Sequence, residues 1–195
     1  MRIRVIRSFA VAAILMAVGV WTTNAQERSA APALWLKTTA FSDGGDIPMK
    51  YSSCNLAPGA PMVSPAFQWS NAPKATAGFV LIMHDIDFNP QKSVLDVTHW
   101  TAYNIPASAT ELPEGIAPDS PVAGTGVQGK NNRGMNGYLG PCPPAGNRPH
   151  HYVFEFYALD QRLDLPAGAA RADLLKAMDG HIIGKSSYVG MFPPK

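Results

Sequence analysis

The chain has 195 residues, of which 46% are hydrophobic, and this length suits one domain with one sizeable core. Its 16 basic and 14 acidic residues nearly balance, and no run of lysines and arginines could follow nucleic-acid phosphates, so a nucleic-acid partner has no support. The 18 prolines and 17 glycines are scattered, as expected when short strands are joined by turns.

Residues 1–25 are predicted to form a secretory signal peptide. Three arginines precede an apolar run over 9–20, and small residues provide a cleavage site that ends at Ala25. The apolar run is shorter than the roughly 20 residues that span a bilayer. We therefore expect cleavage near Ala25, no stable membrane anchor afterwards, and a periplasmic or secreted bacterial protein.

The mature chain is expected to begin with a flexible lead-in over 26–33, followed by a domain over 34–195. Three basic residues and no acidic residue leave with the signal peptide, so the mature net charge is about −1. We find no repeat, low-complexity segment or linker that would divide the domain.

The two cysteines, Cys54 and Cys142, are predicted to form a disulfide, because an even number of cysteines in an exported chain favours pairing. The alternative is a pair of buried thiols. A catalytic cysteine is less favoured, because prolines flank Cys142 and no helix N-terminus is expected beside it to lower its pKa.

Strand patterns dominate the chain up to residue 105. Alternating apolar residues predict a first strand over 34–41, and Phe67 and Trp69 alternate in the next. The continuous run over 79–83 predicts a buried strand, since its length and its β-branched and aromatic content favour strand over helix. Another strand is expected over 98–105. Strict alternation would place Trp100, Ala102 and Asn104 on one face of it and His99, Thr101 and Tyr103 on the other.

The second half of the chain begins with a segment rich in glycine, proline and asparagine over 106–149. Loops of this length commonly carry binding sites. A strand is expected over 151–159, a short helix over 170–178 that stops at Gly180, and a final strand over 182–189. The pattern indicates a mainly antiparallel β domain with one or two peripheral helices. The tryptophans expected in its core are Trp35, Trp69 and Trp100.

Four polar segments lie at predicted strand ends, and each has an ordinary structural explanation when taken alone. An Asp-x-Asp is typical of a turn, and a histidine that opens a strand is typically solvated or satisfied in the core. Their order along the chain makes the case for a site. The segments are Asp85-Ile86-Asp87, Thr98-His99-Trp100, 137–144 and His150-His151-Tyr152.

The order and spacing of these segments resemble the phosphatidylethanolamine-binding protein family, also called Raf kinase inhibitor-like, in its bacterial YbhB/YbcL-like branch. The matching residues are Val63-Ser64-Pro65, Trp69, Pro73, Phe79, Asp85-x-Asp87, His99-Trp100, Gly137-Tyr138-x-Gly140-Pro141-Cys142-Pro143-Pro144 and His150-x-Tyr152. The resemblance implies two packed antiparallel β-sheets and a small preformed pocket for anions such as phosphate, a phospholipid headgroup or a carboxylate. It implies no cofactor.

The resemblance also implies which residues line this pocket. They are Asp85, Asp87, His99, Tyr138, Gly140, Cys142, Pro143, Pro144, His150 and Tyr152. Imidazole and hydroxyl groups and backbone amides are donors suited to anion oxygens. An aspartate would orient an imidazole and favour its protonated form, so we expect anion affinity to fall as pH rises through the histidine range.

The chain departs from the family pattern at two positions. His151 replaces the arginine of the family's His-Arg-Tyr, which weakens the expected cationic group there. Ile86 replaces the first proline of the family's Asp-Pro-Asp-Ala-Pro, which removes a backbone constraint from the aspartate loop.

The alternative function is a periplasmic hydrolase, either metal-dependent or using aspartate and histidine. The residue types that ligate zinc are present as Asp85, Asp87, His99, His150 and His151. However, neither a His-Glu-x-x-His nor a Gly-x-Ser-x-Gly motif occurs, so we favour a binding or regulatory module without catalytic residues or a metal. A protein partner is left open, and a homodimer is expected because bacterial relatives often form one.

Overall fold

Short strands and turns build most of the domain. The computed structural model describes residues 33–194, except 55, 58, 91 and 147. The predicted signal peptide and residues 26–32 of the predicted lead-in lie outside these described residues. The elements are β1 (Trp35–Lys37), β2 (Gly45–Asp46), a 3₁₀-helix η1 (Met49–Tyr51), β3 (Phe67–Ser70), β4 (Gly78–Asp85), β5 (Val97–Pro106), β6 (Glu111–Leu112), β7 (Val127–Gln128), β8 (His150–Leu159), α1 (Arg171–Met178) and β9 (Ile182–Phe192).

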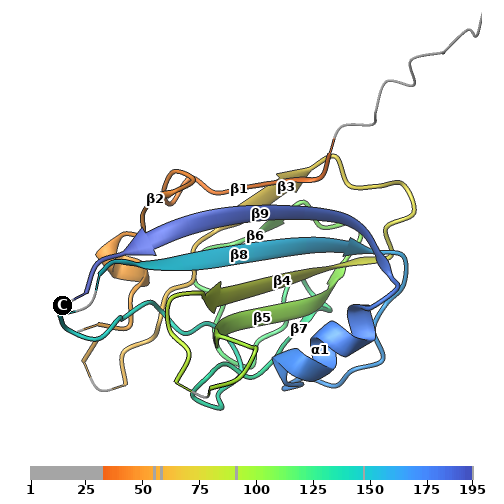
Figure 1. The fold of residues 1–195 in the computed structure, drawn as a ribbon. Coiled ribbons are helices and arrows are strands. Elements are labelled where there is room, and N and C mark those ends of the chain that lie inside the picture. The colour runs from red at the N-terminus through yellow and green to blue at the C-terminus, as the bar shows by residue number, and fades with distance from the viewer. Residues whose placement is uncertain (1–32, 55, 58, 91, 147, 195) are drawn as a thin grey trace, which may run out of the picture. The chain divides into compact units, whose positions relative to one another are not determined.

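The strands form two sheets, as predicted. The small sheet has the order β1-β3-β6, and the large sheet has the order β2-β9-β8-β4-β5-β7. Figure 1 shows the long strands β9, β8, β4 and β5 in this order across the large sheet. Neighbouring strands are antiparallel except β2 and β9, which are parallel. The predicted mainly β fold with short helices at its periphery is confirmed.

Strand β4 is buried on both faces, which explains its continuous apolar sequence. Its side chains alternate between two cores. Phe79, Leu81 and Met83 face the larger core, which lies between the two sheets. Val80 and Ile82 face a second core that contains residues of α1. The single apolar run predicted as a buried strand therefore serves both layers of the domain.

A β-bulge in β5 breaks the predicted alternation. Tyr103 and Asn104 together lie opposite Val80, and Asn104 adopts a φ of 55°, in the left-handed region that asparagine tolerates. The Asn104 side chain accepts a hydrogen bond from the backbone N of Leu163 (2.8 Å) and donates one to its O (2.9 Å). Ile105 faces the inter-sheet core instead. The predicted placement of Asn104 on that face is therefore wrong.

A second register shift lies at the other end of β5. It falls between Met83 and His84 of β4, and it leaves His99 without a partner residue in that strand. The His99 ring lies edge-on to Tyr152 of β8, with 5.0 Å between the ring centroids. The prediction that His99 shares a face with Tyr103 is wrong, because bulges re-aim side chains.

The predicted helix and final strand are confirmed with small changes in their ends. Leu174 and Met178 of α1 are fully buried. Arg171, at the first position of α1, is also buried, and its Nη1 donates to Asp96. The Nδ1 of His84 lies 2.8 Å from the same carboxylate, so Asp96 connects α1 to β4.

The beginning of the domain differs most from the prediction. The first strand is short, with Leu36 buried and Trp35 63% exposed, because β1 contributes only one face to the core. The predicted core position of Trp35 is wrong. Trp69 and Trp100 are buried, as predicted.

Candidate functional site

A pocket of about 150 Å³ opens where β4, β5 and β8 meet three loops. The strands contribute Asp85, Val97, His99 and Tyr152 to its walls. Loop residues complete the walls, and they are Ser53, Phe88, Asn132, Arg133, Leu139, Gly140, Cys142, Pro143 and Pro144. Three long strands of the large sheet thus position the deep part of the pocket.

Asp85 is the last residue of β4 and lies directly opposite Tyr152 in the register of β4 and β8. Residues paired in this way point to the same face, so both side chains reach the pocket. Asp85 is 2% exposed and accepts hydrogen bonds from His150 Nδ1 (2.7 Å) and from the backbone N of Asp87 (2.9 Å). Burial, together with the charge and hydrogen bond of Asp85, raises the pKa of Tyr152. The tyrosine is a neutral donor to this carboxylate.

The side chain of His99 is oriented by the loop before the Gly-Pro segment. Its Nδ1 donates to the backbone O of Leu139 at 2.7 Å, and the backbone N of Leu139 donates to the O of His99 at 2.8 Å. A carbonyl only accepts, so the proton is on Nδ1, and Nε2 of the neutral ring is an acceptor. Burial lowers the pKa of His99, and the Leu139 hydrogen bond and the Asp85 charge oppose this shift without reversing it. The expectation that an aspartate favours the protonated imidazole is therefore not met at His99.

Asp87 lies beside the pocket and ties the aspartate loop to β8. It accepts hydrogen bonds from the backbone N (2.7 Å) and Nδ1 (2.8 Å) of His151, and it forms an ion pair with Arg148. Although burial opposes the shift, these contacts hold the pKa of Asp87 below its usual value. Arg148 thus supplies a cation near the position where His151 replaces the family's arginine. The hydrogen bond from the Asp87 backbone to Asp85 closes the turn that contains Ile86.

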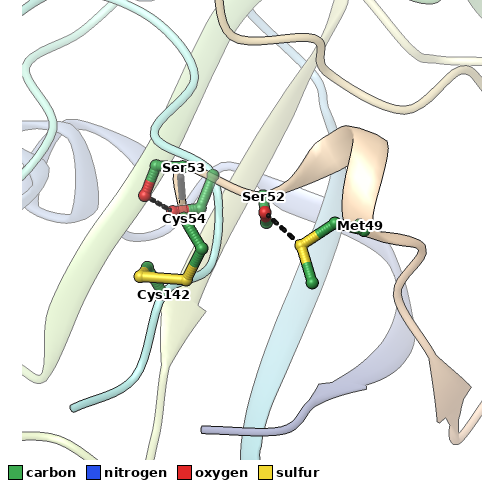
Figure 2. The surroundings of a disulfide bond; sticks show 6 residues. Met49, Ser52, Ser53, Cys54 and Cys142 are labelled. Atoms are coloured by element: carbon green, nitrogen blue, oxygen red, sulfur yellow. Dashed lines mark hydrogen bonds between the residues drawn. A yellow bond between two sulfur atoms is a disulfide. The ribbon is translucent and has the colours of Figure 1, made fainter. Parts of the chain in front are cut away.

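The Gly-Pro wall is fastened to the segment after η1. Ser53 donates from its hydroxyl to the O of Gly140 (2.8 Å) and from its backbone N to the O of Pro141 (3.1 Å). A Cβ on Gly140 would lie 2.5 Å from the backbone N of Ser53, so only glycine permits this approach. Cys54 and Cys142 form the predicted disulfide, which is confirmed, and Figure 2 shows it beside Ser53.

Seven of the predicted site residues line the pocket, and they are Asp85, His99, Gly140, Cys142, Pro143, Pro144 and Tyr152. Three others support its walls from outside. His150 and Asp87 bond to Asp85, and Tyr138 is 3% exposed and donates to the backbone O of Tyr51 (2.8 Å). These three residues are not among those that line the pocket.

Sequence reasoning missed the cationic residue of the pocket, Arg133. It lies seven residues before Gly140, in the polar run that begins at Lys130. A basic residue so close to the Gly-Pro motif was the available signal. The other lining residues that the motifs did not indicate are Ser53, Phe88, Val97, Asn132 and Leu139.

Metal ligation has no ready geometry in the part of the chain that the structure describes. There, no three side chains among histidine, cysteine, aspartate and glutamate come together as a metal site would require. Within the same residues, no helix has both the length and the apolar character needed to cross a bilayer.

Sequence comparisons identify related proteins. The family model described as phosphatidylethanolamine-binding protein matches residues 37–193. A UPF0098 protein of Methanothermobacter thermautotrophicus is 40% identical over 157 residues, which cover 80% of this chain and 97% of that protein. A relative in Mycobacterium tuberculosis, LppC, is 34% identical over 163 residues, covering 84% of this chain and 74% of that protein, and its name proposes a lipoprotein.

Solved structures share the fold. The structure of CT736 from Chlamydia trachomatis, described as a homologue of phosphatidylethanolamine-binding protein, is 36% identical with a TM-score of 0.71 and covers 84% of this chain and 99% of its own. Escherichia coli YbcL, described as a new member of the mammalian family, is 25% identical with a TM-score of 0.72 and covers 84% and 100%.

Proposed function

Because the chain belongs to the phosphatidylethanolamine-binding protein family, with the YbhB/YbcL type among its relatives, we propose that its pocket binds a small anionic group. The candidates are phosphate, a phospholipid headgroup and a carboxylate. The observation that carries the proposal is a pocket with one exposed guanidinium, that of Arg133, on a wall that is already ordered. A cation in such a pocket attracts oxyanions, and an ordered wall lowers the cost of binding.

The pocket is ordered by bonds that do not involve a ligand. The Leu139 and Ser53 hydrogen bonds and the disulfide hold the loop that carries Gly140. Asp85 is held by His150 and by the turn that contains Asp87. We propose that residues facing the pocket contact the ligand, while Asp87, Tyr138 and His150 position them.

The proposal includes export. We propose that residues 1–25 are a signal peptide, that 26–33 are a flexible lead-in and that 34–195 are the binding domain, which acts in the periplasm or outside the cell. The disulfide between Cys54 and Cys142 supports an oxidising compartment, and the name of the mycobacterial relative supports export.

We propose a binding module that modulates another protein rather than an enzyme. Neither the family nor the names of the relatives indicate a catalytic activity. The protein partner is unidentified, and self-association into a homodimer is part of the proposal, to be measured by the mass of the particle in solution. No observation specifically favours the hydrolase.

The experiment that tests anion binding is calorimetric titration of the mature protein with inorganic phosphate, with glycerol 3-phosphate and with acetate. Val97 lines the pocket, so Val97→Phe should fill it and weaken binding by at least about tenfold. Val94→Phe is the matched control, because Val94 is fully exposed outside the pocket. Absence of binding by the wild-type protein, or equal binding by both variants, would refute the proposal.

A further inference from the structure

A second pocket, of about 370 Å³, lies beside the N-terminus of α1, and we call it the α1 pocket. Residues 170–172 form one of its walls, and the loop over 130–134 contributes another. Asn132 lines both this pocket and the candidate site, so the two are neighbours. No other lining residue is shared, so the α1 pocket is a separate place on the surface.

Helix α1 begins without a side-chain cap. Ala170 is its N-cap residue, and an alanine side chain cannot accept hydrogen bonds from the backbone N–H groups of the first turn. The backbone N of Leu174 donates to the O of Ala170 (3.0 Å). The N–H groups before it, on Arg171, Ala172 and Asp173, have no acceptor within the helix. Their partial positive charge favours an anion at this end of α1.

The guanidinium of Arg171 adds a buried cation to the same wall. Its side chain is 9% exposed, and among the described residues only its Nη1 has a hydrogen-bond partner, Asp96. The Nε of Arg171 is buried and unpaired in that part of the chain. Nε and Nη2 together form the second edge of the guanidinium, which presents two parallel N–H donors. Because a buried donor without a partner is costly, an oxyanion that paired with this edge would gain affinity.

Lys130 brings a second cation to the α1 pocket. Its backbone N donates to the O of Ala169 (3.2 Å), which holds the loop against the beginning of α1. Its ammonium is exposed, and no carboxylate of the described residues lies within ion-pair distance of it. The next residue, Asn131, orders the loop, because its buried side chain accepts from the backbone N of Arg133 (2.9 Å) and donates to the O of Gly137 (3.0 Å).

The acidic groups near the α1 pocket do not cancel these cations. The Asp96 carboxylate is already shared between Arg171 and the Nδ1 of His84. The sequence over 120–154 contains neither aspartate nor glutamate, so the loop that carries Lys130 has no carboxylate of its own. Asp173 belongs to the first turn of α1 but does not line the pocket. The walls therefore present more positive than negative charge.

We propose that the α1 pocket is a binding site for an oxyanion with two oxygens on one centre, a phosphate or a carboxylate. The Nε–Nη2 edge of Arg171 and the first-turn N–H groups of α1 bind the oxygens, and the Lys130 ammonium balances the charge. This site is separate from the candidate anion pocket, so it can exist whether or not that pocket binds a ligand. Free ions and acidic groups on a larger ligand share the required chemistry.

The test is an NMR titration of the ¹⁵N-labelled mature protein at pH 7 with inorganic phosphate and, separately, with acetate. The amide signals of Ala172 and Asp173 and the Nε–H signal of Arg171 should shift and saturate together. Tighter binding of phosphate would assign the site to phosphate groups, and tighter binding of acetate would assign it to carboxylates. The same shifts should persist in Val97→Phe, which fills the candidate site and leaves the α1 pocket open.

Two substitutions test the binding groups. In Ala170→Asp the new carboxylate can accept from the first-turn N–H groups, so anion affinity should fall at least about tenfold while the Tm rises. Lys130→Ala removes one exposed charge and should weaken binding at least about threefold. Lys176→Ala is the matched control, because Lys176 is also exposed but lies in the last turn of α1, outside the pocket.

Three results would overturn the inference. Absence of saturable shifts at Ala172 and Asp173 with either probe would refute the α1 site, while the candidate anion pocket would stand. Wild-type affinity in both Ala170→Asp and Lys130→Ala would show that these groups do not bind the ion. Disappearance of the shifts in Val97→Phe would show that they are transmitted from the candidate site.

Discussion

Removal of the disulfide should cost this domain a large part of its stability. Cys54 and Cys142 are separated by 88 positions, and cross-linking a loop of that size lowers the entropy of the unfolded chain by an amount worth about 4 to 5 kcal/mol. The hydrogen bonds of Ser53 to Gly140 and Pro141 do not involve the disulfide, so we expect the folded wall to persist in the reduced protein. The effect should therefore arise mainly in the unfolded state.

The assay is urea unfolding of the oxidised wild-type protein and of Cys54→Ala/Cys142→Ala, followed by tryptophan fluorescence. The free energy of unfolding should fall by about 4 kcal/mol, and the m-value should rise, because the open unfolded chain exposes more surface. Ser53→Ala is the control for local damage, since it removes one hydrogen bond to the wall and should cost about 1 kcal/mol. A loss below about 1 kcal/mol in the double variant, with an unchanged m-value, would refute the entropic argument.

Two further predictions concern β5. Asn104→Ala should lower the free energy of unfolding by about 2 to 4 kcal/mol, because it removes two hydrogen bonds to Leu163 and places alanine at a positive φ. Asn104→Gly should recover part of this loss in the same urea assay, because glycine adopts a positive φ without strain. His99 has a lowered pKa in the folded state, so protons bind the unfolded chain preferentially, and stability should fall as pH drops below about 6.5. Unfolding midpoints at pH 7.5, 6.5 and 5.5 should slope less in His99→Gln, and identical slopes would count against the argument.

Much of the sheet architecture could be predicted because burial leaves a simple pattern. The apolar run at 79–83 can be accommodated only where both faces are covered, and β4 occupies such a position. In an antiparallel pair, the end of one strand lies beside the beginning of the next. Asp85 at the end of β4 therefore lies opposite Tyr152 near the beginning of β8. The even cysteine count likewise predicted the disulfide.

The errors arise where a tertiary contact overrides the local period. Alternation cannot reveal that β5 contains an extra residue at Asn104, because the reason is a loop around Leu163 nearly 60 positions later. The exposure of Trp35 depends on which face of β1 packs on the core, and a run in which Leu34, Trp35 and Leu36 are all apolar does not reveal that face.

The candidate site shows the same limit at the level of protons. The residue type of His99 suggested a donor, but its tautomer is decided by the carbonyl of Leu139, 40 positions away. Arg133 belongs to the pocket only because Asn131 folds its loop toward β5. Both contacts join residues through the folded structure, and a single sequence contains no pattern that predicts either of them.

The pocket combines two regions that should differ in the free energy of local unfolding, and the pair Asp85 and Tyr152 belongs to the more stable one. These residues sit on the central strands β4 and β8, whose amides are shielded by both cores and open only when most of the domain unfolds. The mouth around Arg133 and Phe88 consists of loops outside the sheet pairings, and we expect such loops to open at a lower free energy than the central strands. Substitutions at the mouth can therefore alter which ligand is admitted while the domain remains folded. Substitutions in the interior of the pocket should instead lower the stability of the whole domain.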